Sequence, residues 1–419
     1  MGLHLCQLCE IAYFVTDKIP LENVLLTDYV TTDSLLPNKE GRCVAQNLPP
    51  QKCVLTHYKC GDVLVSNIRP YLKKIWFADR EGGASADVLV FRAKSGHSQE
   101  YLYASLLQDS FYDYVMKGKK GSKMPRGDKA QIMRYSIPKL SLAEEACIGN
   151  IILSFCTKIN INRQINDNLE AMAKQLYDYW FVQFDFPNED GKPYKSSGGA
   201  MVWNEKLKRE IPVGWSVKNL GQIATSYQQG LIRSNNQLST DSKYGYLKMG
   251  DLDGKGQYTL QGLTRTNATN EEVDLYSLHK GDFLINVRNS KEIVGKTCLI
   301  GYVERNTLYN HMLVRLDFKD VSTFYMNLLF NSEFMYKALD GLKQGTTTVI
   351  ALYQSDLYRL PILIPAPCVM ERFLKITDSI LDQKEIISHE IAELTKQRNE
   401  LLPLLMNGQA TVNYHLSAY

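Results

Sequence analysis

Planar amide and guanidinium side chains follow two similar strand motifs, and they are the side chains best suited to recognition chemistry in this sequence. Each motif begins with Gly-Asp, at residues 61–65 (GDVLV) and 281–285 (GDFLI), and the spacing puts the polar pairs after them in equivalent places. The pairs are Asn67 with Arg69 and Asn286 with Arg288. In the major groove of DNA, arginine forms two hydrogen bonds to guanine and asparagine forms two to adenine. All four side chains are therefore candidates for reading bases, although the arginines can also simply pair with acids at a strand end.

A basic segment with several glycines runs from Lys117 to Lys129 (KGKKGSKMPRGDK), and its composition is typical of an exposed loop. Asp128 is its only acid. Phosphate contacts position a protein on DNA without reading its sequence, and lysines on a flexible loop suit that role. The cations that we expect at phosphates are Lys119, Lys120, Lys123 and Arg126. A charge run can also be no more than a solvated face.

Two polar stretches in the second half of the chain can supply further contacts. They are residues 227–237 (YQQGLIRSNNQ) and 343–348 (KQGTTT). From them we add Arg233, Lys343, Thr346 and Thr347 to the expected DNA-binding residues.

Motifs for catalysis are missing from the sequence. It contains no GxxxxGK[ST] phosphate loop, no GxGxxG and no Asn-Pro-Pro-aromatic tetrapeptide. His389-Glu390 begins a zinc-protease pattern, but Glu393 stands where the second histidine is required. Cys6 and Cys9 form a CxxC without a second pair, so we expect no metal and no cofactor in this chain. The pattern favours a binding protein over an enzyme.

Composition indicates an ordinary globular protein. The chain has 419 residues, 44% apolar and 22% charged, which is enough for two domains with proper cores. A net charge of +3 is too weak to indicate nucleic-acid binding by itself. The sequence contains no apolar run long enough for a membrane span, and its first residues do not resemble a secretory signal peptide. We therefore expect no membrane partner and a cytoplasmic location. The odd number of cysteines, nine, then favours reduced thiols.

The chain repeats itself, and each copy ends in a long helix. Ile165 recurs as Ile387, 222 residues later, and Ile137-Pro138 recurs as Leu360-Pro361. Two similar globular units alternating with two helices can place two similar surfaces at a fixed separation, which suits recognition of a repeating polymer.

The two helices show the apolar spacing of a coiled coil. The first, from about 143 to 181, carries Ile148, Ile152, Phe155, Ile159, Ile165, Leu169, Met172, Leu176 and Trp180. The second, from about 370 to 406, carries Phe373, Ile380, Ile387, Ile391, Leu394, Leu401 and Leu405, with Thr377, Lys384 and Arg398 in the gaps. We expect antiparallel pairing, with Asn162 and Lys384 fixing the register, Pro403 kinking the second helix and Gly408 capping it. The alternative is a helix bundle within one domain.

Each globular unit should mix short strands with one amphipathic helix. In the first unit we expect strands at 63–65, 88–91 and 135–138 and a helix at 99–116. In the second we expect strands at 283–287, 297–300 and 312–316 and a helix at 321–340. The predicted class is α+β, with two mixed α/β recognition domains separated by two long helices that form an antiparallel coiled coil in a pseudo-twofold repeat.

Two stretches carry a family resemblance. Residues 176–215 (LYDYWFVQFDFPNEDGKPYKSSGGAMVWNEKLKREIPVGW) and 397–412 (QRNELLPLLMNGQATV) closely resemble the specificity subunit of type I restriction-modification systems. The likeness covers the whole chain in order, and in the recognition domains it rests on position and short echoes such as Gly-Asp before a strand.

The resemblance implies a non-catalytic subunit that binds a bipartite, asymmetric sequence in double-stranded DNA. It also implies two methyltransferase subunits docked on the helices, restriction and translocase subunits, and S-adenosylmethionine, ATP and Mg as cofactors of those partners. The domains it suggests are a first recognition domain (1–141), a central helical region (142–183), a linker (184–214), a second recognition domain (215–367), a distal helical region (368–408) and a tail (409–419). The competing hypotheses are a two-domain protein-interaction scaffold without DNA binding and, disfavoured by the missing motifs, a stand-alone nuclease or methyltransferase.

Overall fold

A computed structural model describes residues 4–50, 53–121, 124–252, 256, 258–260, 262–345 and 350–411. The chain has the expected α+β composition and divides into two compact units: residues 1–165 with 390–419, and residues 166–389. The long helices α5 (Leu142–Tyr177) and α11 (Pro367–Met406) contribute residues to both units. Within the described residues, no helix combines the length and the apolar content needed to cross a membrane.

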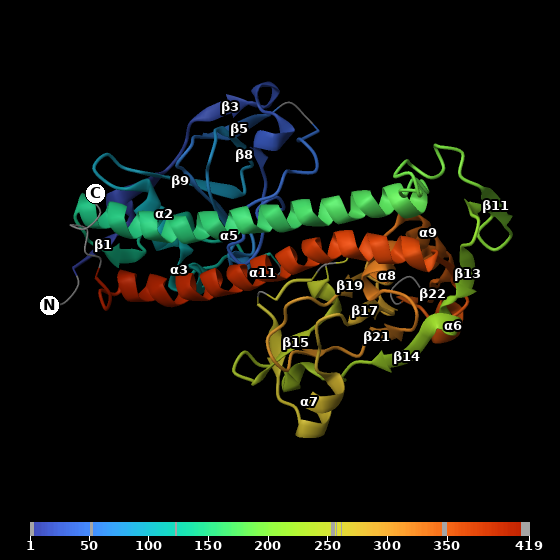
Figure 1. The fold of residues 1–419 in the computed structure, drawn as a ribbon. Helices are drawn as coiled ribbons and strands as arrows, with labels where there is room; N and C mark the ends of the chain where they lie inside the picture. Colours follow the sequence, from blue (N-terminus) through green and yellow to red (C-terminus); the bar gives the residue numbers. More distant parts are fainter. Residues whose placement is uncertain are drawn as a thin grey trace. The chain divides into compact units, whose positions relative to one another are not determined.

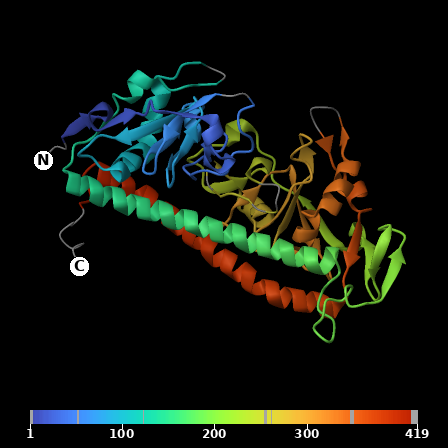
Figure 2. The same cartoon turned by 90° about the horizontal axis from the view of Figure 1, so that it is seen from above.

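A four-stranded antiparallel sheet forms the centre of the first unit, in the order β2-β9-β6-β7. These strands are β2 (Ala12–Phe14), β9 (Val88–Ala93), β6 (Val63–Ser66) and β7 (Ile75–Phe77). A second sheet, β3-β5-β8-β4, and the pair β1-β10 complete the unit, drawn in blue and teal in Figure 2. Their bounds are β1 (Leu5–Gln7), β3 (Lys18–Pro20), β4 (Tyr29–Val30), β5 (Val54–Tyr58), β8 (Gly82–Ala84) and β10 (Ser136–Pro138).

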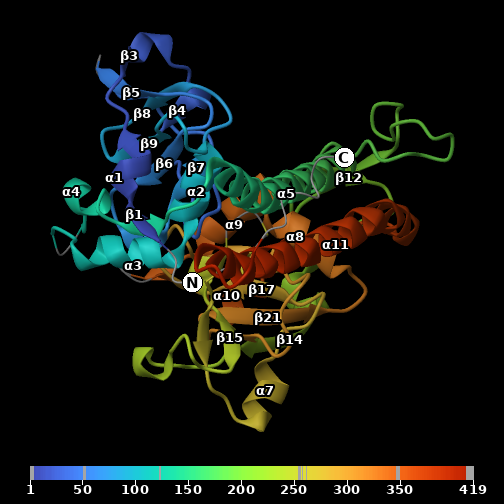
Figure 3. The ribbon, with the colours of Figure 1, turned by 90° about the vertical axis from the view of Figure 1, so that its left-hand side faces the viewer.

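The second unit repeats this topology. Its four-stranded sheet has the order β14-β21-β17-β19, in which β17 (Phe283–Asn286) takes the place of β6. Figure 3 shows β17, β21 and β14 in this arrangement. The other strands are β11 (Met201–Asn204), β12 (Arg209–Pro212), β13 (Ser216–Asn219), β14 (Ala224–Gln229), β15 (Tyr244–Leu247), β16 (Thr264–Thr266), β18 (Arg288–Asn289), β19 (Thr297–Leu299), β20 (Leu308–Tyr309), β21 (Leu313–Phe318), β22 (Gln344–Gly345), β23 (Ile350–Ala351) and β24 (Pro361–Ile364).

The repeated Gly-Asp motif has a structural cause. Gly61 (φ 88°) and Gly281 (φ 93°) both adopt the left-handed conformation that turns the chain into the strand, and glycine adopts it without steric cost. The aspartate that follows is held by an arginine of the neighbouring strand: both oxygens of Asp62 accept from Arg92 at 2.7 Å, and Asp282 accepts from Arg315 at 3.2 Å. The motif therefore fixes where β6 and β17 begin.

Each predicted amphipathic helix is in fact two helices, which corrects the expectation. The segment 99–116 forms α2 (Gln99–Leu107) and α3 (Asp109–Lys117), and 321–340 forms α8 (Thr323–Phe330) and α9 (Glu333–Leu342). Ser332 starts α9 by accepting a hydrogen bond from the amide of Met335, an N-cap that a periodicity argument does not detect. The remaining helices are α1 (Leu8–Ile11), α4 (Lys129–Ile132), α6 (Leu220–Ile223), α7 (Asn270–Tyr276) and α10 (Gln354–Leu357).

The long helices pair antiparallel in both units (Figure 1). In the second unit, Asn166 bonds Ser388 and Trp180 contacts Phe373, so residue numbers rise along α5 as they fall along α11. In the first unit, Arg398 approaches the Cys156 thiol at 3.8 Å in the same sense. The coiled-coil pairing expected from the sequence is therefore confirmed.

Burial confirms the predicted seam of α11 and corrects that of α5. On α11, Phe373, Thr377 and Arg398 are buried, polar positions included. On α5, Ile165 is 40% and Met172 is 55% exposed, although both were expected in the seam. Ala173 and Tyr177 are buried instead, together with Leu169 and Trp180. The sequence of α5 carries two neighbouring apolar stripes, and only contact with α11 decides which one is buried.

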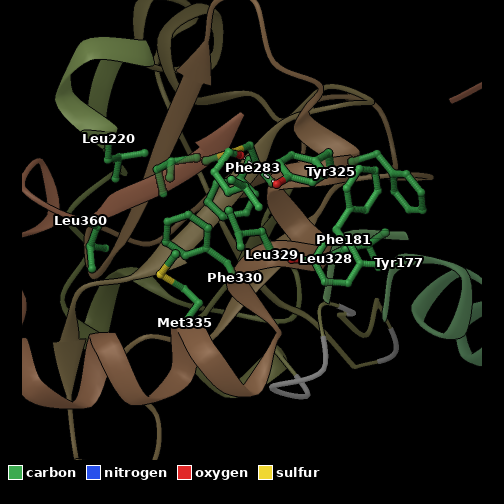
Figure 4. Packing of buried hydrophobic residues seen from close by; sticks show 14 of the residues in the cluster. Tyr177, Phe181, Leu220, Phe283, Tyr325, Leu328, Leu329, Phe330, Met335 and Leu360 are labelled. Carbon is green, nitrogen blue, oxygen red and sulfur yellow. Dashed lines mark hydrogen bonds between the residues drawn. The ribbon is translucent and has the colours of Figure 1, made fainter. Parts of the chain in front are cut away.

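Each unit is closed by the end of one long helix. In the second unit, Tyr177 and Phe181 enter a core with Phe283 of β17 and Tyr325 of α8 (Figure 4). The Phe181 and Tyr325 ring centroids are 5.0 Å apart. In the first unit, the end of α11 takes this role: Leu402, Leu405 and Met406 pack with Leu8, Ile11 and Tyr101.

The segment predicted as a linker is folded. Phe186 stacks on Trp215 at 5.2 Å, and β11 pairs with β12. Gly408 has a φ of 72°, which confirms it as a left-handed cap after α11, and helix α11 continues through Pro403 to Met406. A composition rich in glycine and proline concealed the aromatic anchors of this segment.

Candidate nucleic-acid interface

In the first unit, the basic segment forms a hairpin that is fastened to the end of β6. Lys120 and Arg126 exchange two backbone hydrogen bonds of 2.9 Å, and Ile68 pairs with the other side of Arg126. The amide of Arg69 donates to the carbonyl of Pro125 at 2.8 Å, and the amide of Gly127 donates to the carbonyl of Asn67 at 3.3 Å. The structure therefore brings together two groups of predicted residues that are far apart in the sequence.

Acids hold the cations in the middle of this hairpin. Nη2 of Arg126 lies 3.0 and 3.2 Å from the two carboxylate oxygens of Asp87. Nζ of Lys120 lies 2.5 Å from Asp128. The hydrogen bond from Lys120, with the backbone amides of Gln131 and Ala130, lowers the pKa of Asp128 to about 2. Asp128 also caps α4, so one carboxylate orders both the hairpin and the helix after it.

The other hairpin cations are placed differently. The side chain of Lys119 is exposed and forms no ion pair with any described residue. Lys123 lies outside the described residues. Lys119 is therefore available to contact a DNA phosphate.

Arg69 stands at a strained position beside the hairpin. Its φ is 50°, in the left-handed region that non-glycine residues seldom adopt, and its side chain is exposed. Pro70 is buried, and Lys73 of the same turn bonds Asp109 of α3 at 2.7 Å. Arg69 directly precedes the 3-10 turn Pro70–Leu72, which is therefore anchored before its start by the Arg69 amide on Pro125 and after its end by Lys73 on Asp109.

Asn67 is less available than the sequence suggested. It is half-buried, its amide donates to the carbonyl of Asp87 at 2.9 Å, and its side-chain oxygen is buried without a partner among the described residues. These contacts tie together β6, the hairpin and the turn that carries Asp87. Its first role is to position the loops around it.

The second unit contains an equivalent hairpin. Strands β22 and β23 form it, and β18 pairs with β23, so Gln344, Ala351 and Arg288 stand in one row across three strands. In the first unit the same row consists of Lys120, Arg126 and Ile68. Directly opposed residues of antiparallel strands project from the same face of a sheet. We call these two rows the ribbon rows.

The strand register corrects the equivalence drawn from the sequence. Ser66 pairs with Val88 on β9, and Asn286 pairs with Leu313 on β21, so Asn286 corresponds to Ser66 and not to Asn67. Both side chains bond the backbone two residues on: Ser66 donates to the carbonyl of Ile68 at 3.0 Å, and Asn286 accepts from the amide of Arg288 at 3.1 Å. Asn286 is fully buried and shapes the strand end.

Arg288 has a neighbour that the sequence did not single out. Arg288 is exposed and makes no ion pair with any described residue. Burial and the nearby Arg288 charge lower the pKa of His311, whose amide donates to the carbonyl of Leu231. A neutral imidazole can both donate and accept a hydrogen bond. His311 is 23 residues from Arg288 in the sequence, so only the folded structure shows that the two are neighbours.

The remaining predicted residues of the second unit are engaged internally or lie outside the described part. Arg233, 10% exposed, donates to Glu272 at 2.6 Å and to Thr266 and Asn267. The side chain of Lys343 is 4% exposed, 3.2 Å from Asp340, and donates to the carbonyl of Lys291. Thr346 and Thr347 fall outside the described residues.

Nothing in the described part of the chain assembles a metal centre. Groups of three or more His, Cys, Asp or Glu side chains placed to share an ion are absent from it, and all nine cysteines are free thiols. Cys6 is buried and Cys9 half-buried. The ring of His389 packs edge-on against Tyr302 at 5.3 Å.

Residues 212–396 match the family model of the type I restriction modification DNA specificity domain. The MjaIX specificity subunit of Methanocaldococcus jannaschii is 24% identical, across 76% of this chain and 71% of that protein. The HindI specificity subunit of Haemophilus influenzae is 24% identical, across 91% of this chain and 94% of that protein. A type I restriction-modification S subunit from M. genitalium aligns in structure with a TM-score of 0.47, 12% identity and coverage of 97% of this chain and 96% of the other.

Proposed function

Because this chain belongs to the DNA specificity subunits of type I restriction-modification systems, we propose that each of its two β-rich units reads one half of a bipartite, asymmetric DNA site. The observation that carries the proposal is the repeated hairpin. In each unit it pairs with the segment that follows the equivalent sheet strand, β6 in the first unit and β17 in the second. The recognition domains are residues 1–141 and 215–367. Two similar readers suit two half-sites spaced along one duplex.

Charge at the first hairpin supports contact with DNA. Lys119, Lys120 and Arg126 are exposed on or beside a hairpin whose backbone is bonded to that of the exposed Arg69 through Pro125. Lysines there suit the phosphate backbone, which supplies affinity, and guanidinium groups suit base edges, which supply specificity. A β-ribbon of this width fits the major groove.

We propose that the helices set the spacing between the two half-sites and dock two methyltransferase subunits. Support for docking comes from apolar side chains left uncovered on α5 and on the π-helical turn Asp178–Val182 that continues it: Met172 is 55% exposed, Tyr179 38% and Val182 44%. They recur at helical spacing, so a partner helix can cover them together. Uncovered apolar side chains at this spacing favour a protein partner on the helix pair.

The chain itself contributes recognition and not chemistry. The methyltransferase subunits supply the S-adenosylmethionine site, and the restriction and translocase subunits supply the ATP and Mg sites. The assembled complex acts on double-stranded DNA in the cytoplasm. The competing function is a protein-interaction scaffold that uses both units to bind proteins and no DNA.

Salt-dependent DNA binding separates these two functions. We expect the chain, purified with its methyltransferase partner, to bind duplexes with an affinity whose logarithm falls linearly with the logarithm of salt concentration, since phosphate contacts release counterions. Fluorescence anisotropy on the cognate duplex and on a scrambled duplex measures it. An assembled complex that binds neither duplex favours the scaffold.

A further inference from the structure

We infer that one arginine in each ribbon row, Arg126 in the first unit and Arg288 in the second, reads a guanine, whereas the lysines of the first hairpin contact only phosphate. The inference rests on the proposed function and assigns roles within that interface. It separates Arg126 from Lys119, with which the sequence had grouped it.

The backbone of Arg126 is held on both sides. One neighbour is Lys120, through two hydrogen bonds, and the other is Ile68, two residues after the end of β6. The residues before and after it are fastened as well, Pro125 to Arg69 and Gly127 to Asn67. A base-reading side chain must reach a fixed point, so a fixed backbone is the first requirement.

The side chain of Arg126 is oriented by an acid but keeps hydrogen-bond donors available for a base. Asp87 engages only Nη2, while Nε and Nη1 form no hydrogen bond with any described residue. The side chain remains 54% exposed. A carboxylate that orients a guanidinium and leaves donors open reduces the rotamer freedom lost on binding a base.

Arg288 occupies the same row in the second unit. It pairs with Ala351, the residue that corresponds to Arg126, so each row contains one exposed arginine on a different strand. The Asn286 side chain bonds the Arg288 amide and fixes its backbone. Arginine reads guanine through O6 and N7, whereas Lys119, exposed and unpaired among the described residues, matches phosphate.

Base-pair scanning with the assembled complex tests the assignment. Anisotropy is measured on the cognate duplex, on duplexes with each half-site pair replaced in turn, and on an unrelated duplex. We expect Arg126→Lys, which keeps the charge, to weaken cognate binding about 5- to 150-fold while unrelated DNA binds as before, because a good bidentate contact contributes that much discrimination. The loss should map to one G·C pair of one half-site, and Arg288→Lys should act on the other half-site.

Two further variants distinguish orientation from charge. Asp87→Asn removes the carboxylate charge that orients Arg126, and we expect it to relax discrimination at the same G·C pair without weakening unrelated DNA. Lys119→Gln, the control on the same hairpin, should weaken all duplexes alike. Thermal unfolding of each variant checks that the fold is intact.

Two results overturn the inference in different ways. If Arg126→Lys discriminates like the wild type, or if it weakens cognate and unrelated DNA equally, the row does not read bases and the proposed function stands. If the wild-type complex binds no duplex, the proposed function and the inference fall together.

Discussion

Asn166 donates a hydrogen bond from its side-chain amide to the hydroxyl of Ser388 at 3.2 Å, and the two residues are 222 positions apart. That separation equals the shift that relates Ile165 to Ile387 in the sequence repeat. Equivalent positions of the two helices thus face each other, as the central residues of an antiparallel pair of like helices do. One turn away, Lys384 forms an ion pair with Glu170.

The Glu170–Lys384 pair should fix the register of the helices in the second unit. We expect Glu170→Ala to lower the free energy of unfolding by about 1–3 kcal/mol, because Lys384 is 15% exposed and loses a carboxylate partner. Urea unfolding measures it, with the exposed Asp167→Ala as the matched control, expected within about 0.5 kcal/mol of wild type. Equal effects of the two substitutions would show that the Glu170–Lys384 pair does not fix the register of the helices.

The hairpin lysines should contribute affinity without specificity. We expect the combined replacement of Lys119, Lys120 and Lys123 by alanine to weaken cognate and unrelated DNA similarly, and to reduce the salt slope by about one for each lost phosphate contact. Binding measured across a salt series reports both quantities. A loss confined to cognate DNA would place these lysines in the groove.

The second recognition domain should act as an independent reader. Residues 215–365 contain a complete sheet, with β17 at its centre and α8 packed against it. Replacing them by the corresponding domain of another family member should change one half of the methylated motif and leave the other half as it was. Methylome sequencing of cells that carry the chimera gives the answer, and a change in both halves would refute independent reading.

Helix length should set the unread spacer between half-sites. The contact of Cys156 with Arg398 sets a register that puts Ala392 opposite Asn162. Adding four residues after Asn162 and four at Ala392 lengthens the pair by about 6 Å, close to two base-pair steps. We expect the methylated motif to keep both half-sites and to gain about one or two base pairs of spacer. Unchanged spacing in a folded complex would make the helices docking elements only.

Patterns that depend on neighbours in the sequence predicted their structures well. The heptad spacing of α11 anticipated buried Thr377 and Arg398, and the Gly-Asp motif marked the start of β6 and β17. Glycine at a left-handed position and apolar spacing at helical period are local requirements, so they are visible in one sequence.

What depends on distant pairing was not visible. The spacing aligned Asn286 with Asn67, but hydrogen bonds to β21 align it with Ser66. Arg233 was predicted to be an exposed DNA-binding side chain, but in the structure it is mostly buried and paired with Glu272 of α7. A one-residue shift of register or a single acid from another segment reverses the role of a side chain, and neither is encoded in its neighbours.

We propose that this chain selects the DNA sequence that its complex methylates. Methylome sequencing of the host with the gene, without it, and with the gene restored measures that selection. We predict that one bipartite adenine-methylated motif disappears on deletion and returns on complementation. An unchanged methylome after deletion would show that the chain does not select the methylated sequence.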